Sequence, residues 1–216
     1  MVAMRRLVVV GTCAALALVA GCARQGDAGP DVIVSPTEER FPFSTLSEAR
    51  SFADQWVVAT VDQEVVGKVQ GEGPPDEGYV PRSVTISIHG VASEGPPGAV
   101  RGDTVELDVL GYALHDGVRV PLVSEGGQRL GVGETYLFGL AVDEGDVILP
   151  SARAAFLIDD GQVSVERRFG ERDDLADHLA GRPITEAVEL VQDATPAVSP
   201  DISSLSARLD AHLAET

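Results

Sequence analysis

Alternating apolar and polar positions mark the middle of the chain. In residues 82–91, Val84, Ile86 and Ile88 fall on one face of an extended segment, and residues 103–110 repeat the pattern with valine and leucine. A period of two is that of a β-strand with one buried face. The other segments with strand character are 56–66, 118–123, 135–142, 155–158 and 162–166. The pattern therefore predicts six or seven strands.

Helical patterns lie on both sides of the predicted strands. Thr45 and Glu48 have the spacing of a capping box, which predicts a short helix that continues to about residue 55. Apolar residues return to helical spacing after the last strand, over 173–180, 184–192 and 200–214. Leucines recur every four positions in the last of these segments, which predicts a terminal amphipathic helix capped by Ser199.

Two further patterns constrain the arrangement of the strands. Residues 135–142 are apolar on both faces, so we expect this strand to be central or to close a barrel. Asp160-Gly161 separates two short strands and predicts a hairpin. Strands with short antiparallel connections and flanking helices are typical of a mainly β fold with α additions. The expected form is a small barrel or sandwich followed by C-terminal helices.

Three long connections separate the strands. They are rich in glycine, the first two also contain a Pro-Pro pair, and they cover 67–78, 93–102 and 124–133. Segments of this composition are usually loops on the surface of a protein. We expect all three to be exposed and to tolerate substitution.

The N-terminal segment has the pattern of an export signal. Arg5 and Arg6 precede an apolar run over residues 7–20, which is too short to cross a bilayer comfortably as a helix. The run ends at Val19-Ala20-Gly21-Cys22, which resembles the lipobox of bacterial lipoproteins. The resemblance implies a signal peptide over 1–21, cleavage between Gly21 and Cys22, and a lipid such as palmitate attached at Cys22. Two or more acyl chains anchor a protein firmly to a membrane.

The lipobox resemblance and the composition together suggest a domain organisation. Residues 22–42 are expected to hold the lipidated Cys22 and a flexible linker, because Gly, Pro and charged residues dominate there. The apolar Val32-Ile33-Val34 run allows a second interpretation, an edge strand. A β-barrel domain with its short N-terminal helix follows at 43–168, and a helical segment at 169–216. Cleavage would leave Cys22 as the mature chain's single cysteine, so no intramolecular disulfide is expected.

The charge balance limits the partners of this chain. The 216 residues include 16 Lys+Arg and 34 Asp+Glu, a formal net charge of −18. Binding to nucleic acid depends on Lys and Arg that replace counterions on phosphates, so a nucleic-acid partner is not expected.

The lipobox resemblance predicts an extracytoplasmic location, with the chain anchored to a bacterial membrane. The expected partners are that membrane and either an envelope protein or a small ligand.

The order of the predicted strands and one short motif carry a second resemblance. The strands over 56–66, 82–91 and 103–110 are followed by Val132-Gly133-Glu134-Thr135-Tyr136-Leu137-Phe138. This arrangement resembles an OB-fold domain of the netrin-like type, shared by tissue inhibitors of metalloproteinases, over residues 50–166. It implies an OB-like antiparallel β-barrel that binds ligands across its second and third strands. The disulfides of the eukaryotic members are absent, and Cys22 lies too far ahead of the fold to act as the inhibitors' zinc-chelating cysteine.

The resemblance directs attention to the polar positions of the second and third strands. If the alternating apolar residues point inward, the outward residues are Thr85, Ser87, His89, Thr104, Glu106 and Asp108. Two interpretations remain for this face: a small ligand- or metal-binding cluster around His89, or an ordinary solvated strand surface. The face offers neither the aromatic platform nor the basic groove that single-stranded nucleic acid requires.

Recognisable catalytic and metal motifs are absent from the sequence. The four histidines form neither an HxH nor an HExxH pattern, and no G-x-S-x-G elbow is present. No catalytic residue, metal site or cofactor is therefore predicted. The leading hypothesis is a non-enzymatic binding or interaction module of the cell envelope. The alternatives are an envelope hydrolase whose site is assembled from separate strands and a carrier that holds an apolar ligand.

Overall fold

A computed structural model describes residues 32–35, 41–71, 77–93, 100, 102–202 and 204–215. The strands are β1 (Ile33–Ser35), β2 (Gln55–Val66), β3 (Gly78–Val91), β4 (Thr104–His115), β5 (Val118–Ser124), β6 (Thr135–Asp143), β7 (Asp146–Ile148), β8 (Ala155–Asp159) and β9 (Gln162–Ser164). The helices are α1 (Leu46–Phe52), α2 (Asp174–Leu179), α3 (Ile184–Asp193) and α4 (Leu205–Glu215), with a 3₁₀ turn at Ala152–Ala154. The predicted signal peptide, including Gly21 and Cys22, lies outside the described residues.

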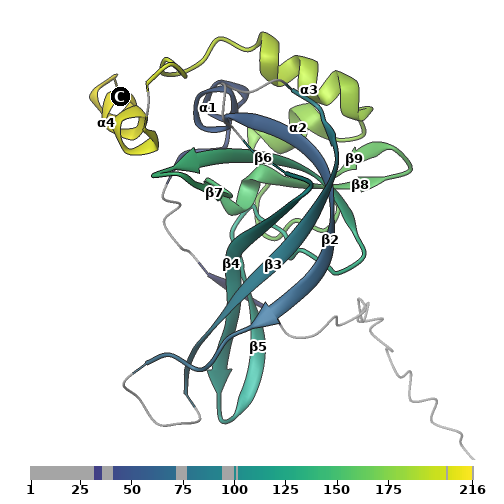
Figure 1. The fold of residues 1–216 in the computed structure, drawn as a ribbon, viewed down its shortest axis with the longest axis vertical. Coiled ribbons are helices and arrows are strands. Elements are labelled where there is room, and N and C mark those ends of the chain that lie inside the picture. The colour runs from purple at the N-terminus through teal and green to yellow at the C-terminus, as the bar shows by residue number, and fades with distance from the viewer. Residues whose placement is uncertain are drawn as a thin grey trace, which may run out of the picture.

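The strands form one curled sheet with the shape of a half-barrel (Figure 1). The strand order is β1-β5-β4-β3-β2-β6-β8-β9, and β7 pairs with β6. β6 returns to lie beside β2, which gives the Greek-key order β6-β2-β3-β4. The prediction of a mainly β fold with C-terminal helices is confirmed. The helices gather at one end, and the long β2, β3, β4 and β5 strands extend away from it (Figure 1).

Tight turns set the register of three hairpins in the sheet. Asp116, Glu144 and Asp160 each have a positive φ and precede a glycine that also has a positive φ. Two successive positive φ values are those of a type I′ turn, whose twist matches that of paired strands. The hairpin predicted at Asp160-Gly161 is therefore confirmed. The hairpin at Glu144 was not predicted, because the three residues of β7 are too few to show a pattern.

The central strands contribute alternate residues to two hydrophobic cores. Val57 and Phe138 lie in the core enclosed by the curled sheet. Their neighbours Trp56 and Leu137 point the other way, into a core shared with the helices. This explains why residues 135–142 are apolar on both faces, and β6 is a central strand between β2 and β8 as expected.

The short helix α1 begins as its sequence predicts. The Thr45 hydroxyl accepts a hydrogen bond from the Glu48 amide at 3.2 Å, and the Glu48 carboxylate accepts one from the Thr45 amide at 3.0 Å. Both halves of the capping box are thus formed.

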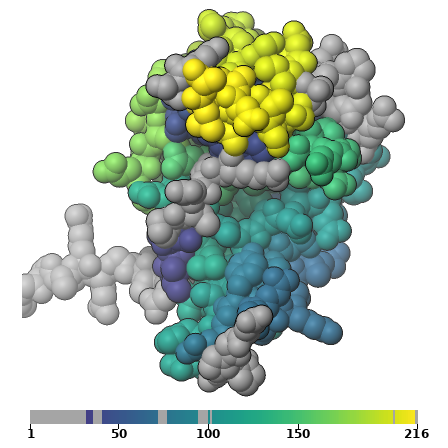
Figure 2. Space-filling model, turned by 90° about the vertical axis from the view of Figure 1, so that its left-hand side faces the viewer, coloured from purple at the N-terminus to yellow at the C-terminus, as the bar shows by residue number. Residues whose placement is uncertain are grey.

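In the space-filling view, α4 lies over the same end of the molecule as α1 (Figure 2). None of the described helices is long and apolar enough to cross a membrane.

Two described segments of the predicted linker belong to the fold. Ile33–Ser35 is an edge strand, paired in parallel with residues 122–124 of β5, so the second interpretation of the apolar run is the one observed. Phe41 was assigned to the linker, but it is 1% exposed and its ring packs 6.0 Å from that of Phe52. The linker boundary at residue 42 is therefore too late, because composition alone did not show that this Phe belongs to the core.

Two other sequence predictions need correction. The glycine-rich segment 124–133 was expected on the surface, but half of its residues are buried. A Cβ at Gly127 would lie 3.1 Å from Ala152 Cβ, so the close packing there favours glycine. The last helix begins at Leu205, where the Ser204 hydroxyl accepts a hydrogen bond from the Ala207 amide at 3.2 Å. Ser199 is therefore not the cap of this helix.

Candidate functional site

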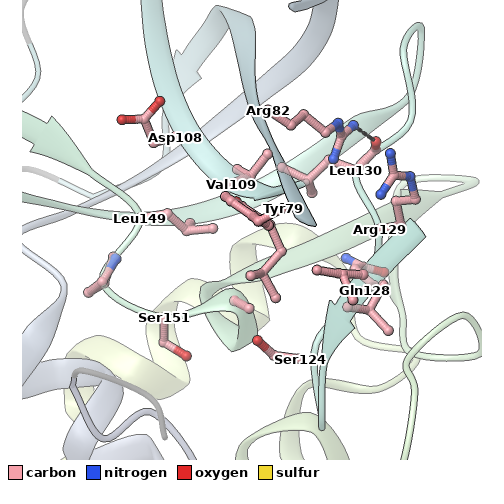
Figure 3. A pocket seen from close by; sticks show the side chains of 15 residues that line it. Tyr79, Arg82, Asp108, Val109, Ser124, Gln128, Arg129, Leu130, Leu149 and Ser151 are labelled. Atoms are coloured by element: carbon pink, nitrogen blue, oxygen red, sulfur yellow. Dashed lines mark hydrogen bonds between the residues drawn. The ribbon is translucent and has the colours of Figure 1, made fainter. Parts of the chain in front are cut away.

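A pocket of about 370 Å³ lies on the open side of the half-barrel (Figure 3). Its walls come from β3, β4, β5 and the two segments that follow β5 and β7. The residues that line it are Tyr79, Arg82, Asp108, Val109, Leu110, Leu122, Val123, Ser124, Gln128, Arg129, Leu130, Leu149, Pro150, Ser151 and Ala152. The pocket thus brings together elements that are far apart in the sequence.

Two guanidinium groups form one wall of the pocket. Arg82 is only 3% exposed, and it donates a hydrogen bond to the Leu130 carbonyl oxygen (Figure 3). Its Nη2 also lies 3.2 Å from a carboxylate oxygen of Glu64. Arg129 Nη2 lies 3.7 Å from the other oxygen of the same carboxylate. One carboxylate therefore faces two guanidinium groups.

Tyr112 completes this charged cluster. Its hydroxyl donates a hydrogen bond to the Glu64 carboxylate, and its ring lies 4.4 Å from the guanidinium carbon of Arg129. Partial burial tends to raise the pKa of Glu64. The hydrogen bond from Tyr112 and the charge of Arg82 outweigh that effect and lower this pKa below its ordinary value. The Glu64 carboxylate is therefore ionised at neutral pH.

The two arginines carry more positive charge than the cluster neutralises. Burial lowers the pKa of Arg82, and repulsion from the nearby Arg129 lowers it further. An arginine keeps its proton near neutral pH even when its pKa is lowered. Two guanidinium groups and the Glu64 carboxylate thus leave a local excess of one positive charge on this wall.

Two buried nitrogen atoms of this wall have no acceptor among the described residues. They are Arg82 Nε and Arg129 Nη2, and neither makes a hydrogen bond with a protein group described by the structure. The latter faces Glu64 only at ion-pair distance. Buried donors in native proteins are nearly always satisfied. The wall therefore offers donors to a group that enters the pocket.

The remaining walls are apolar with a few placed polar groups. Leu122, Leu149 and Pro150 are among the apolar side chains that face the pocket. Gln128 is fixed by a hydrogen bond that its Nε2 donates to the Ala155 carbonyl at 2.9 Å. Asp108 lies across the drawn pocket from Arg129 (Figure 3). Such a mixture of apolar walls and convergent polar groups is typical of a small-ligand site.

The predicted polar face is present on β3 and β4, but its members do not form a cluster. Thr85 lies opposite Glu106 in the register of the two strands. The Ser87 hydroxyl donates a hydrogen bond to Asp62 rather than to a residue of β4. His89 Nε2 is hydrogen-bonded to Thr60 Oγ1 on β2 at 2.7 Å. The structure thus places His89 with β2 and not with the β4 carboxylates.

Three of the predicted face residues line hollows in the surface. Thr104, Glu106 and Asp108 border a second hollow of about 650 Å³ between β4 and the segment around β7. Asp108 also belongs to the arginine-lined pocket, so it joins the two. In the described part of the chain, no group of three His, Cys, Asp or Glu side chains is placed to hold a metal ion.

Sequence reasoning missed the arginines of the pocket, although one signal was available. Arg82 is in phase with Val84 and Ile86 on the buried face of β3. A charged residue at an inward position of a strand indicates a buried polar site. Arg129 carried no such signal, because it belongs to the glycine-rich segment that was expected on the surface.

The motif behind the netrin-like resemblance has a structural role next to the pocket. The buried Tyr136 hydroxyl donates a hydrogen bond to Glu134 and accepts one from the Gly131 amide at 2.8 Å. Glu134 in turn forms an ion pair with Arg167. Burial and the hydrogen bond to Glu134 raise the pKa of Tyr136, so its hydroxyl keeps its proton. These contacts fix the segment that carries Arg129 and Leu130.

Comparison with models of known protein families and with curated proteins finds no match to this chain. The pocket lining contains Ser124 and Ser151, but none of the described histidines. The described lining therefore shows no Ser-His pair of the kind a serine hydrolase uses.

Proposed function

We propose that this chain is a non-enzymatic binding protein of the cell envelope, held at a membrane by a lipid on Cys22. Its ligand binds in the arginine-lined pocket. The basic start, the apolar run and the Val19-Ala20-Gly21-Cys22 sequence support the anchor. The pocket supports the binding role.

The observation that carries the binding role is the composition of the pocket wall. The buried Arg82 and the half-buried Arg129 face a cavity of about 370 Å³ whose other walls are largely apolar. Charged groups are costly to bury, and a site with donors that the protein does not use is expected where a ligand provides acceptors. This arrangement supports a site on the open side of the half-barrel.

The interior of the sheet supports this location over the carrier alternative. Ile86, Tyr136 and Phe138 are fully buried within the curl and fill it with side chains. A ligand in the interior would have to displace this packed core, whereas the pocket is already open. The Greek-key order of the strands is consistent with the OB-like barrel that we propose for this domain.

A binding assay with envelope metabolites tests the proposed site. Ligand-observed NMR with a small-molecule extract of the source cells would compare the native chain with Ala152→Phe, which fills the pocket. Val118→Phe is the matched control, because Val118 is 62% exposed and lies outside the pocket. We expect at least one component to bind the native chain and the control but not Ala152→Phe. Equal binding by all three proteins, or by none, would contradict the proposal.

The anchor is tested separately by mass spectrometry of the chain isolated from membranes. We expect an N-terminal peptide that begins at Cys22 and carries a thioether-linked diacylglycerol. The Cys22→Ser variant should lack the lipid and lose its membrane attachment. An intact leader, or an unmodified thiol at this position, would remove the proposed location but leave the pocket unaffected.

A further inference from the structure

We infer that the pocket binds an amphipathic anion, with a carboxylate or phosphate headgroup on Arg82 and Arg129 and an apolar body against the opposite walls. This inference rests on the proposed function and adds the chemical class of the ligand. It is carried by the donors on one wall, the apolar residues on the others and the surplus of positive charge.

The arginine wall is suited to an oxyanion. A guanidinium group presents donors in a rigid planar fork that matches the oxygens of carboxylate and phosphate. Arg82 Nε and Arg129 Nη2 are both buried and make no hydrogen bond with a described protein group. An anionic headgroup would satisfy both donors and neutralise the charge that Glu64 leaves uncompensated.

The apolar walls are suited to a hydrocarbon body. Val109, Leu122, Leu149 and Pro150 contribute side chains to the same cavity. An apolar group placed against them leaves water, which contributes about 25 cal/mol per Å² of buried apolar surface. An inorganic anion alone would gain nothing from these walls, so the site favours an organic anion.

Asp108 gives the bound anion a direction. Asp108 lies at the edge of the pocket far from Arg129, and its exposed carboxylate points away from the arginine wall (Figure 3). It repels a second negative charge and so favours a headgroup placed at the arginine wall. A monoanion with its charge at one end fits this arrangement better than a dianion with charges at both ends.

Buried arginines elsewhere in the molecule make different contacts. Arg208 is also nearly buried, at 4% exposure. Its Nε and Nη1 donate to backbone carbonyls at 2.9 and 3.0 Å, and its Nη2 lies 2.8 Å from Asp54. An open donor is thus not a feature of every buried arginine in this fold, and the open donor of Arg82 belongs to a residue that lines a cavity.

Calorimetric titration of the intact chain in lipid nanodiscs tests the inference. The probes are 3-phenylpropanoate, benzyl phosphate and the neutral 3-phenylpropanamide, which has nearly the shape of the carboxylate. We expect the better of the two anions to bind at least about tenfold more tightly than the amide, since a hydrogen bond to a charged group contributes about 1.5–3 kcal/mol. The ratio between the two anions distinguishes a carboxylate site from a phosphate site.

Variants assign the binding to the arginine wall. Arg129→Gln should weaken the preferred anion about tenfold and leave the amide unchanged, whereas Arg129→Lys should restore part of the loss. Arg119→Gln is the matched control, because Arg119 is exposed on β5 outside the pocket. Asp108→Asn should tighten anion binding about twofold, since it removes a repelling charge. Thermal unfolding of each variant shows whether the fold is retained.

The outcomes separate this inference from the proposed function. If the amide binds as tightly as both anions, or if Arg129→Gln and Arg119→Gln behave alike, the anionic ligand class is wrong. The same holds if no probe binds while the metabolite extract still yields a ligand that Ala152→Phe loses. If neither the probes nor the extract bind, both the inference and the proposed function fail.

Discussion

The two ends of the molecule use buried arginines differently. At the helical end, Arg208 directs all its nitrogen atoms to protein groups, including the Asp54 carboxylate at 2.8 Å. At the other end, which we call the open end because it holds the pocket on the open side of the half-barrel, Arg82 is equally buried. It retains a donor without an acceptor among the described residues. Burial alone therefore does not distinguish a structural charge from a functional one. An open donor on a residue that also lines a cavity does.

Arg168 also binds protein groups on the helical side of the sheet, through its two terminal nitrogen atoms. It donates hydrogen bonds to the backbone carbonyls of Gly126, Arg153 and Ala155, and its guanidinium lies 4.0 Å from the ring centroid of Phe156. Each of these contacts joins segments that are distant in the sequence. Such arginines order loops, whereas Arg82 and Arg129 border a cavity.

Removal of the Arg208 charge should have the largest effect on stability. Arg208→Met leaves the Asp54 carboxylate buried without its partner, and breaking a buried ion pair in this way costs about 3–5 kcal/mol. Chemical denaturation measures the free energy of unfolding. The double variant with Asp54→Asn should recover part of the loss, because no uncompensated charge remains. If Arg208→Met lowered the free energy of unfolding by less than about 1 kcal/mol, Arg208 would not be the structural charge that we contrast with Arg82.

Loss of the Glu64 charge should have a smaller effect at the open end. Glu64→Gln removes the carboxylate that faces Arg82 and Arg129, with an expected cost of about 1–3 kcal/mol by chemical denaturation. The same variant should bind the anionic probes more tightly, because two guanidinium groups then lack a counter-charge. Destabilisation with unchanged or weaker anion binding would indicate a purely structural cluster.

Acidification should affect the two ends in opposite directions. The pKa of Glu64 is lowered below 4.5, so its stabilising contribution is complete above 4.5 and is lost as the pH falls through the folded-state value. Burial raises the pKa of Asp173 above 3.8, against the hydrogen bond from the Ala176 amide and the charge of Arg168. Its contribution is therefore complete below 3.8 and is lost as the pH rises through the folded-state pKa.

Unfolding free energies measured between about pH 6 and pH 3 test these signs. Glu64→Gln should reduce the fall of stability on acidification. Asp173→Asn should make that fall steeper, because it removes a group that favours the folded state at low pH. Changes of the opposite sign in either variant would contradict the charge assignments of the two ends.

The helix cap at Thr45 should give the smallest effect. Thr45→Ala removes the side chain that accepts the Glu48 amide, and loss of an N-cap costs about 1 kcal/mol. Thermal or chemical unfolding measures this change, with Thr45→Ser as the control that keeps the hydroxyl. If the cap contributed as much as the Arg208 ion pair, the helical end would owe its stability to local structure and not to buried charge.

Much of the fold could be predicted because its signals are local. The capping box at Thr45, the alternation in β3 and the Asp160-Gly161 turn each depend on a few neighbouring residues, and all three are observed. The burial of Phe41 could not be predicted, because it depends on contact with Phe52 in a helix that follows. The edge strand β1 likewise depends on a partner almost ninety residues away along the chain.

The pocket could be predicted only in part. Asp108 was among the predicted face residues and does line it. Arg82 could have been found from its inward phase in β3. Arg129 could not, because the burial of its glycine-rich segment depends on packing against residues near Ala152. When a site is assembled from several segments, no single segment carries a sequence pattern that identifies it.

The Nε–H resonance of Arg82 provides the most direct measurement of the central claim. In ¹H–¹⁵N spectra of the labelled chain, the arginine Nε–H signals are assigned with Arg82→Lys and Arg208→Lys. Addition of 3-phenylpropanoate or benzyl phosphate should shift the Arg82 signal and leave the fully bonded Arg208 signal in place. An Arg82 signal that stays in place at saturating anion, or that moves no more than the Arg208 signal, would contradict the claim that the open end binds its ligand through this arginine.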